Sequence, residues 1–130
     1  MRIAIVDYGS GNLRSAAKAF ERAGGDHDGA VEVLVTSRAD VVAAADRVVL
    51  PGVGAFASAM AVLREKGYVE ALRAYIGANR PFLGVCLGLQ LLFESSDESP
   101  GVAGLGIIKG SVDQFPAEVG GARLSVPHIG

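Results

Sequence analysis

Cys86 is the single cysteine of the 130-residue chain, and a glycine stands two positions before it and two positions after it. The run Gly-Val-Cys-Leu-Gly at 84–88 follows an apolar stretch and precedes a leucine-rich one. This G-x-nucleophile-x-G pattern is typical of a nucleophile elbow, where strand and helix approach too closely for β-carbons at the glycine positions. We therefore predict that Cys86 is a catalytic nucleophile. Without this context a lone cysteine would be read as an inert core residue.

Two backbone amides near this cysteine could stabilise an oxyanion. The N–H of Leu87 directly follows the nucleophile, and we expect it to be free at the start of a helix whose N-terminus would also favour the thiolate. The second candidate is Val53, in the run Pro-Gly-Val-Gly at 51–54. A peptide flanked by glycines can turn its N–H outward without steric cost. An ordinary strand-terminating turn is the alternative for this run.

Short runs of β-branched residues alternate with stretches in which apolar residues recur every three or four positions, as in a helix. These are the elements that would position Cys86 and Val53. Such alternation predicts βαβ units. The expected strands are 3–6, 31–35, 48–50 and 82–85, and the expected helices are 13–24, 40–44, 57–66, 69–78 and 87–93. Residues 94–106 read as a surface loop, and 106–115 and 123–126 as extended segments. The predicted fold class is α/β, a mostly parallel open sheet with helices on both faces, flavodoxin-like and three-layered. The carboxyl ends of its strands would bring Cys86 and Val53 to one edge, where such sheets bind ligands.

Composition narrows the classes of partner. Twelve Lys and Arg against fourteen Asp and Glu give a net charge of -2, so we expect no nucleic acid partner. The uncharged stretch 48–63 contains a proline and glycines and is shorter than the ~20 residues of a membrane span, so we expect no membrane segment. The N-terminus lacks the pattern of a secretory signal. A cytoplasmic location is therefore expected.

Four runs carry a resemblance to a known family: Asp-Tyr-Gly-Ser-Gly-Asn-Leu at 7–13, Leu-Pro-Gly-Val-Gly-Ala-Phe at 50–56, Gly-Val-Cys-Leu-Gly-Leu-Gln-Leu-Leu-Phe at 84–93, and Val-Pro-His-Ile-Gly at 126–130. Together they resemble the class I, or triad, glutamine amidotransferases. Within that family they are most similar to the glutaminase subunits of imidazole glycerol phosphate synthases.

This resemblance implies an activity and a partner. The glutaminase would hydrolyse glutamine to glutamate and ammonia through a cysteine thioester, without a cofactor or a metal. The ammonia would pass to a (β/α)₈ cyclase subunit that makes imidazole glycerol phosphate and aminoimidazole carboxamide ribotide in histidine biosynthesis. By the same resemblance Gly52 and Gln90 would contact glutamine. Asn12, Lys18 and His128 would face the cyclase at the carboxyl edge of the sheet.

The resemblance also implies what this sequence does not hold. The family carries its catalytic histidine, with a glutamate two residues later, in a block beyond the Pro-His motif that here ends at 130. We therefore expect residues 1–130 to form an amidotransferase domain without its C-terminal part. We also expect that neither His27 nor His128 is the general base.

Other interpretations of these motifs are weaker. Gly9-Ser10-Gly11 has the start of a dinucleotide-binding fingerprint, but Arg14 occupies the position of the third glycine. Asp26-His27-Asp28 lacks the further ligands of a usual zinc site, so we expect a solvated loop there. The carboxylates Glu94, Asp97 and Glu98 also read as a solvated face. Two other functions stay open, namely a different elbow-cysteine enzyme of peptidase-like or chaperone-like type, and a catalytically silent binding module.

Overall fold

The computed structural model describes residues 1–27, 29–115, 118–120 and 122–123. In chain order the elements are β1 (Arg2–Val6), α1 (Leu13–Gly24), β2 (Glu32–Thr36), α2 (Ala39–Ala44), β3 (Arg47–Leu50), α3 (Phe56–Glu65), α4 (Tyr68–Gly77), β4 (Phe82–Gly84), α5 (Leu87–Gln90), β5 (Phe93–Ser96), β6 (Ile108–Val112), β7 (Glu118–Val119) and β8 (Ala122–Arg123). None of the helices formed by these residues has the length and apolar composition that a membrane span requires.

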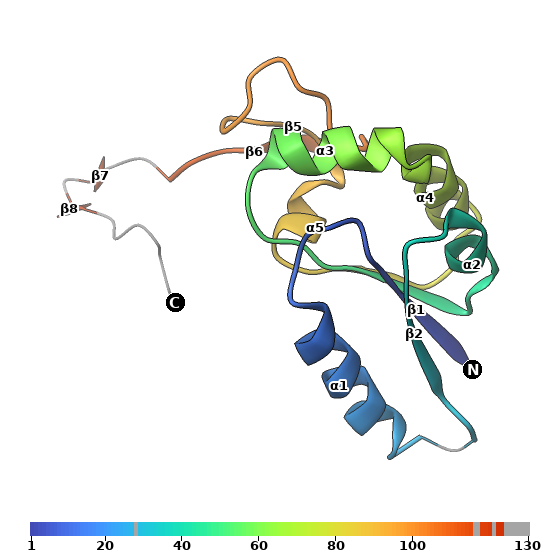
Figure 1. Cartoon of the computed structure of the whole chain (residues 1–130). Coiled ribbons are helices and arrows are strands. Elements are labelled where there is room, and N and C mark those ends of the chain that lie inside the picture. The colour runs from blue at the N-terminus through green and yellow to red at the C-terminus, as the bar shows by residue number, and fades with distance from the viewer. Residues whose placement is uncertain (28, 116–117, 121, 124–130) are drawn as a thin grey trace.

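A parallel sheet of four strands in the order β2-β1-β3-β4 forms the centre of the molecule. Helix α1 lies on one face, and α2, α3 and α4 lie on the other (Figure 1). The predicted α/β class with a parallel sheet and helices on both faces is therefore confirmed. Beside this sheet, β5 and β6 form a separate parallel pair, and β7 and β8 form a short antiparallel pair.

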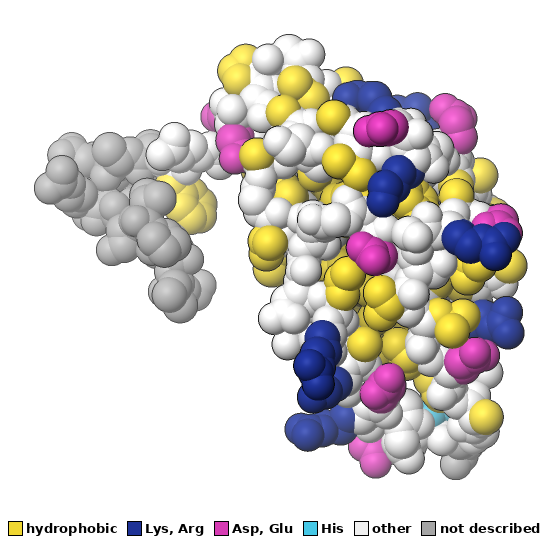
Figure 2. Space-filling view, in the orientation of Figure 1, with side chains coloured by type: hydrophobic (Ala, Val, Ile, Leu, Met, Phe, Trp, Pro, Cys, Tyr) yellow, Lys and Arg dark blue, Asp and Glu magenta, His cyan; other side chains and the backbone are white. Residues whose placement is uncertain are grey.

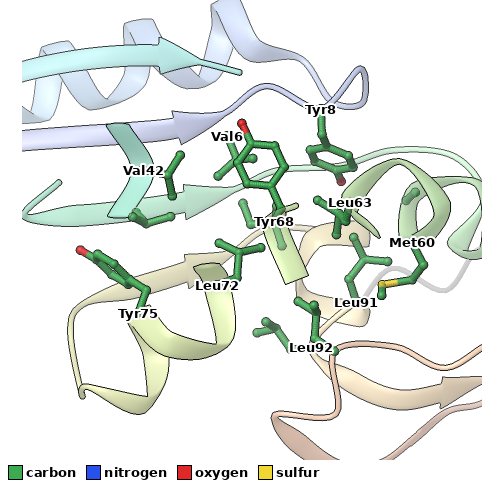
Figure 3. Packing of buried hydrophobic residues seen from close by; sticks show 14 of the residues in the cluster. Val6, Tyr8, Val42, Met60, Leu63, Tyr68, Leu72, Tyr75, Leu91 and Leu92 are labelled. Carbon is green, nitrogen blue, oxygen red and sulfur yellow. The ribbon is translucent and has the colours of Figure 1, made fainter. Parts of the chain in front are cut away.

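The strands divide their side chains between two apolar layers because neighbouring residues point to opposite faces. Ala4, Val6, Val48 and Leu50 point toward α2–α5 and are fully or almost fully buried. Figure 3 shows how the large side chains of this layer pack together. They are, in chain order, Val6, Tyr8, Val42, Met60, Leu63, Tyr68, Leu72, Tyr75, Leu91 and Leu92. The α1 layer is much thinner. Its buried members are Ile3, Ile5 and Val49.

Two predicted elements were wrong in extent. The helix expected over 87–93 ends at Gln90, and the loop expected from residue 94 begins with strand β5. The carbonyls of Leu91 and Leu92 accept hydrogen bonds from the N–H groups of Leu105 (2.8 Å) and Ile107 (2.9 Å), far along the chain. These partners replace the helical ones, so the chain leaves the helix and enters a parallel pair with β6.

Candidate active site

Cys86 lies in the turn that joins β4 to α5, where it is the N-cap residue of that helix. Its φ of 55° and ψ of −122° are values that non-glycine residues rarely adopt. Such a conformation costs about 1–3 kcal/mol and persists only where the surroundings enforce it. The side chain is exposed. The sequence motif thus corresponds to a strained turn that presents the thiol to solvent at the carboxyl edge of the sheet.

Glycines enforce this turn because backbone segments meet there without room for a side chain. A β-carbon on Gly84 would lie 2.9 Å from the Leu89 Cα, and one on Gly88 would overlap the Leu50 carbonyl oxygen. A β-carbon on Gly52 would lie 3.1 Å from the Gly88 nitrogen and overlap the Tyr8 hydroxyl. The start of α5 is therefore packed directly on the segment that follows β3.

The segment Pro51–Gly54 is held by two side chains from the loop after β1. The buried hydroxyl of Tyr8 donates to the Pro51 carbonyl at 2.7 Å. Ser10 Oγ donates to the Val53 carbonyl at 2.6 Å and accepts from the Val53 N–H at 2.9 Å. Burial raises the pKa of Tyr8, with a smaller opposing effect of Ser10, so the phenol stays protonated. Sequence reasoning missed both contacts, since they join residues 43 positions apart.

Both amides expected to stabilise an oxyanion have partners within the chain. The Val53 N–H donates to Ser10, and the Leu87 N–H, expected to be free, donates to the Gly52 carbonyl at 3.2 Å. Helix α5 has only 4 residues, so its dipole is smaller than the sequence suggested. In this arrangement an oxyanion role requires both amides to exchange their partners. The role of these two residues stays a prediction.

Gln90 lies on α5 one turn after Cys86 and is half-buried. It lines a cavity of about 360 Å³ together with polar and acidic residues from β5, β6 and the segments that follow them, namely Ser96, Asp97, Glu98, Asp113 and Gln114. The carboxylates of Glu94, Asp97 and Glu98 are exposed, as predicted, and each also accepts a hydrogen bond from a backbone N–H. Glu94 accepts from the Gly110 N–H at 2.8 Å, and Glu98 accepts from the Phe56 N–H at 3.3 Å. The second contact caps α3, which has no capping side chain of its own.

Two of the residues expected at a partner interface belong to helix α1 and its N-cap. Asn12 is the N-cap of α1, where its side chain accepts from the Ser15 N–H at 3.2 Å. Lys18 is exposed near the middle of the same helix. His128 lies outside the described residues. His27 lies in the connector before β2, at the opposite end of the sheet from Cys86.

The sequence profile of the class I glutamine amidotransferases matches residues 4–122, which include every element around Cys86. The chain belongs to this family. A crystal structure of a glutamine amidotransferase shares the fold of this class I amidotransferase, with a TM-score of 0.67 over 85% of this chain and 55% of that one. The two sequences are 18% identical, so this likeness concerns the fold alone.

More similar sequences come from one branch of the family. The chain is 53% identical to imidazole glycerol phosphate synthase subunit HisH of Methanothermobacter thermautotrophicus and 48% identical to that of Syntrophotalea carbinolica. In both cases the match covers 98% of this chain, and it covers 58% and 60% of the relatives. It is 49% identical to the chloroplastic imidazole glycerol phosphate synthase hisHF of Arabidopsis thaliana, covering 98% of this chain and 20% of that protein. The chain thus spans about three fifths of the length of the HisH relatives.

Proposed function

We propose that this class I amidotransferase chain supplies the nucleophile and the substrate pocket of a glutaminase. The observation that carries the proposal is the position of Cys86, exposed in a strained turn that is packed against the Gly52–Val53 segment. A thiolate in such a turn can approach a carbonyl carbon from outside while backbone amides lie on either side of it. Its relatives of 48–53% identity carry the names of imidazole glycerol phosphate synthase subunits, which supports this assignment.

The reaction would proceed in two steps. The Cys86 thiolate attacks the side-chain amide carbon of glutamine and forms an S–C bond, which places negative charge on the carbonyl oxygen. The N–H groups of Val53 and Leu87 are proposed to stabilise that oxygen once they leave Ser10 and Gly52. The leaving nitrogen takes a proton from water, the C–N bond breaks and ammonia is released. Water attacks the thioester, breaks the S–C bond and releases glutamate and the thiol.

The cavity beside Gln90 suits the amino-acid end of the substrate. Asp97, Glu98 and Asp113 line it, and no lysine or arginine is among its lining residues. Carboxylates favour a bound ammonium group, and the Gln90 amide can both donate and accept a hydrogen bond. Substrate contacts of Gly52 and Gln90 are part of this proposal. Gly52 is buried beneath the turn, so its contribution would come from its backbone.

The partner is proposed to be a separate (β/α)₈ cyclase subunit that receives the ammonia for histidine biosynthesis in the cytoplasm. The HisH relatives are named as subunits of a synthase, which supports an assembly of this chain with another chain. Helix α1 offers a surface for it, because Arg14, Lys18 and Arg22 recur every four residues and are all exposed. Lys and Arg side chains gather over α1 in Figure 2. An acidic face on the cyclase would complement this stripe, with Asn12 at its end.

The test is protection of Cys86 by substrate. The 130-residue chain is treated with 6-diazo-5-oxonorleucine, a thiol-reactive analogue of glutamine, and separately with iodoacetamide, and adducts are followed by intact mass. We expect slow formation of one adduct at Cys86, prevented by millimolar glutamine and not by asparagine. Cys86→Ala, with no other cysteine in the chain, serves as the control.

Two results would contradict the proposal. Equal labelling with and without glutamine would favour a silent binding module, and efficient hydrolysis of a peptide substrate would favour another elbow-cysteine enzyme.

We expect no steady release of ammonia from the isolated chain, because the described residues place no histidine near Cys86. General acid-base catalysis typically contributes about 10²–10⁴-fold in rate.

A further inference from the structure

The chain between β5 and β6 is joined to helix α3 at both ends of that helix. At the N-terminus of α3, the Glu98 carboxylate accepts a hydrogen bond from the Phe56 N–H at 3.3 Å. In the last turn of α3, Arg64 donates from Nη2 to the Ala103 carbonyl at 2.6 Å. Residues 97–103, which we call the acidic segment, therefore lie along α3, as the orange chain beside this helix in Figure 1 shows.

Both contacts suit the charge distribution of a helix. The N-terminus of a helix carries a partial positive charge and favours a carboxylate, whereas the last turn carries a partial negative charge and favours a cation. The residue before α3 is Ala55, so Glu98 supplies the cap from a distant part of the chain. The Arg64 contact is a charge-assisted hydrogen bond, which is stronger than one between neutral groups. Helix α3 therefore holds the acidic segment through a charged side chain at each end.

The acidic segment contributes two of the carboxylates around the cavity beside Gln90. Asp97 and Glu98 line this cavity from one side, and Asp113 lines it from the chain that follows β6. Like charges around one cavity repel each other, and this repulsion acts to push the acidic segment outward. The position of Glu98 therefore depends on contacts that hold the segment from its other side.

The two ends of the acidic segment are held in different ways. Its beginning is joined to β6, because the Asp97 N–H donates to the Val112 carbonyl at 2.9 Å. Its end is held by the Arg64 guanidinium on the Ala103 carbonyl. Arg64 is not among the residues that line the cavity, so any effect of this side chain on a ligand acts through the acidic segment.

We propose that Arg64 is a positioning residue that determines how well the cavity selects ligands with an α-ammonium group. By holding Ala103, Arg64 keeps Glu98 at the start of α3, where the carboxylate lines the cavity and pairs with the ammonium group. The inference rests on the proposed function, since it takes the cavity to bind the amino-acid end of glutamine. A ligand without an α-ammonium group gains nothing from Glu98 and is therefore insensitive to Arg64.

The experiment compares two ligands in their protection of Cys86 against iodoacetamide in the 130-residue chain. One ligand is glutamine, and the other is 4-carbamoylbutanoate, which is glutamine without its α-amino group. Arg64→Met keeps an unbranched side chain and removes the guanidinium donors. We expect it to raise the dissociation constant of glutamine about 3- to 10-fold, the range of indirect effects on a site, and to leave that of 4-carbamoylbutanoate unchanged.

Two further variants serve as controls. Arg64→Lys keeps a cation on a flexible stem and should restore most of the preference for glutamine. Arg38→Met removes an exposed arginine that pairs with Asp40 and should change neither dissociation constant. Hydrogen exchange of the Phe56 amide reports the position of Glu98 without any ligand. Arg64→Met should speed this exchange, and Arg38→Met should not.

The outcomes separate this inference from the proposed function. If glutamine gave the unchanged chain no protection, the proposed function would fail and the inference about selectivity would fail with it. If glutamine protected Cys86 but Arg64→Met weakened both ligands equally, or weakened neither, the inference alone would be refuted. Unchanged exchange of the Phe56 amide in Arg64→Met would also refute it, because Glu98 would then hold its position without Arg64.

Discussion

Replacement of Gly88 by alanine tests the packing on which the candidate active site depends. The added β-carbon would overlap the carbonyl oxygen of Leu50 and lie 2.7 Å from its carbonyl carbon. Restoring an ordinary contact of 3.4 Å from 2.7 Å moves the start of α5 by at least about 0.7 Å. The Leu50 oxygen also accepts the Val85 N–H at 3.0 Å, so this movement strains the bond that fixes the turn.

The expected loss of stability follows from the nature of the atoms involved. Overpacking against flexible side chains costs about 1–3 kcal/mol, and here the clash is with backbone on both sides. We therefore expect Gly88→Ala to lower the free energy of unfolding by about 3–5 kcal/mol, a value at the upper end for single substitutions. With a urea m-value of about 1–3 kcal/mol/M the midpoint would fall by about 1–5 M.

The assay is urea unfolding followed by circular dichroism, with Gly77→Ala as the matched control. Gly77 is the last residue of α4 and has open space around its α-carbon, so alanine should be neutral or stabilise by up to about 1 kcal/mol. Surface substitutions usually change the free energy of unfolding by no more than about 0.5 kcal/mol. If Gly88→Ala changes it by no more than that, the contact between α5 and β3 does not require glycine. Our account of the turn would then be wrong.

Three further results are expected. Ser10→Ala should speed the labelling of Cys86 by the glutamine analogue, since it frees the Val53 N–H, and an unchanged rate would show that this amide takes no part. Arg80→Ala should lower the free energy of unfolding, measured in urea, by about 2–3 kcal/mol, because the guanidinium donates to two carbonyls at the end of α2 and stacks on the Tyr75 ring. Arg38→Ala is the control, since it breaks only an exposed ion pair with Asp40 and should cost under about 1 kcal/mol. Burial raises the pKa of three phenols above the ordinary value for tyrosine, those of Tyr8, Tyr68 and Tyr75. The unfolded chain therefore loses these protons first as pH rises. The stability that the three phenols contribute should be retained below the ordinary tyrosine pKa of about 10 and lost above it, and a urea midpoint that does not fall between about pH 9 and pH 11 would contradict this.

Local patterns were sufficient for most of the fold. Each strand of the main sheet is an apolar run bounded by a turn, and Asn12 caps α1 as its position before the helical pattern predicts. Gly67 separates α3 from α4 because its φ of 75° is one that glycine adopts readily. These features depend on neighbours within a few residues, which is the range that a single sequence reveals.

Contacts between distant residues explain what sequence reasoning missed. Strand β5 contains Glu94 and two serines and has no apolar alternation, yet pairing with β6 and burial of Ser96 hold it in place. The glycine pattern around Cys86 indicated the turn. It could not indicate that Ser10 engages the Val53 amide, since that bond depends on how two loops meet at the end of the sheet.

The conformation of Cys86 also bears on any redesign of this chain for greater stability. Its φ of 55° and ψ of −122° lie where glycine is favoured over every L-amino acid, so Cys86→Gly would relieve part of a strain of about 1–3 kcal/mol. A sequence chosen only for folding stability would therefore discard the thiol. Redesign of this scaffold guided only by stability would favour its loss, and it would need to hold residue 86 fixed. If Cys86 is the nucleophile proposed above, activity and folding stability make opposite demands on this position.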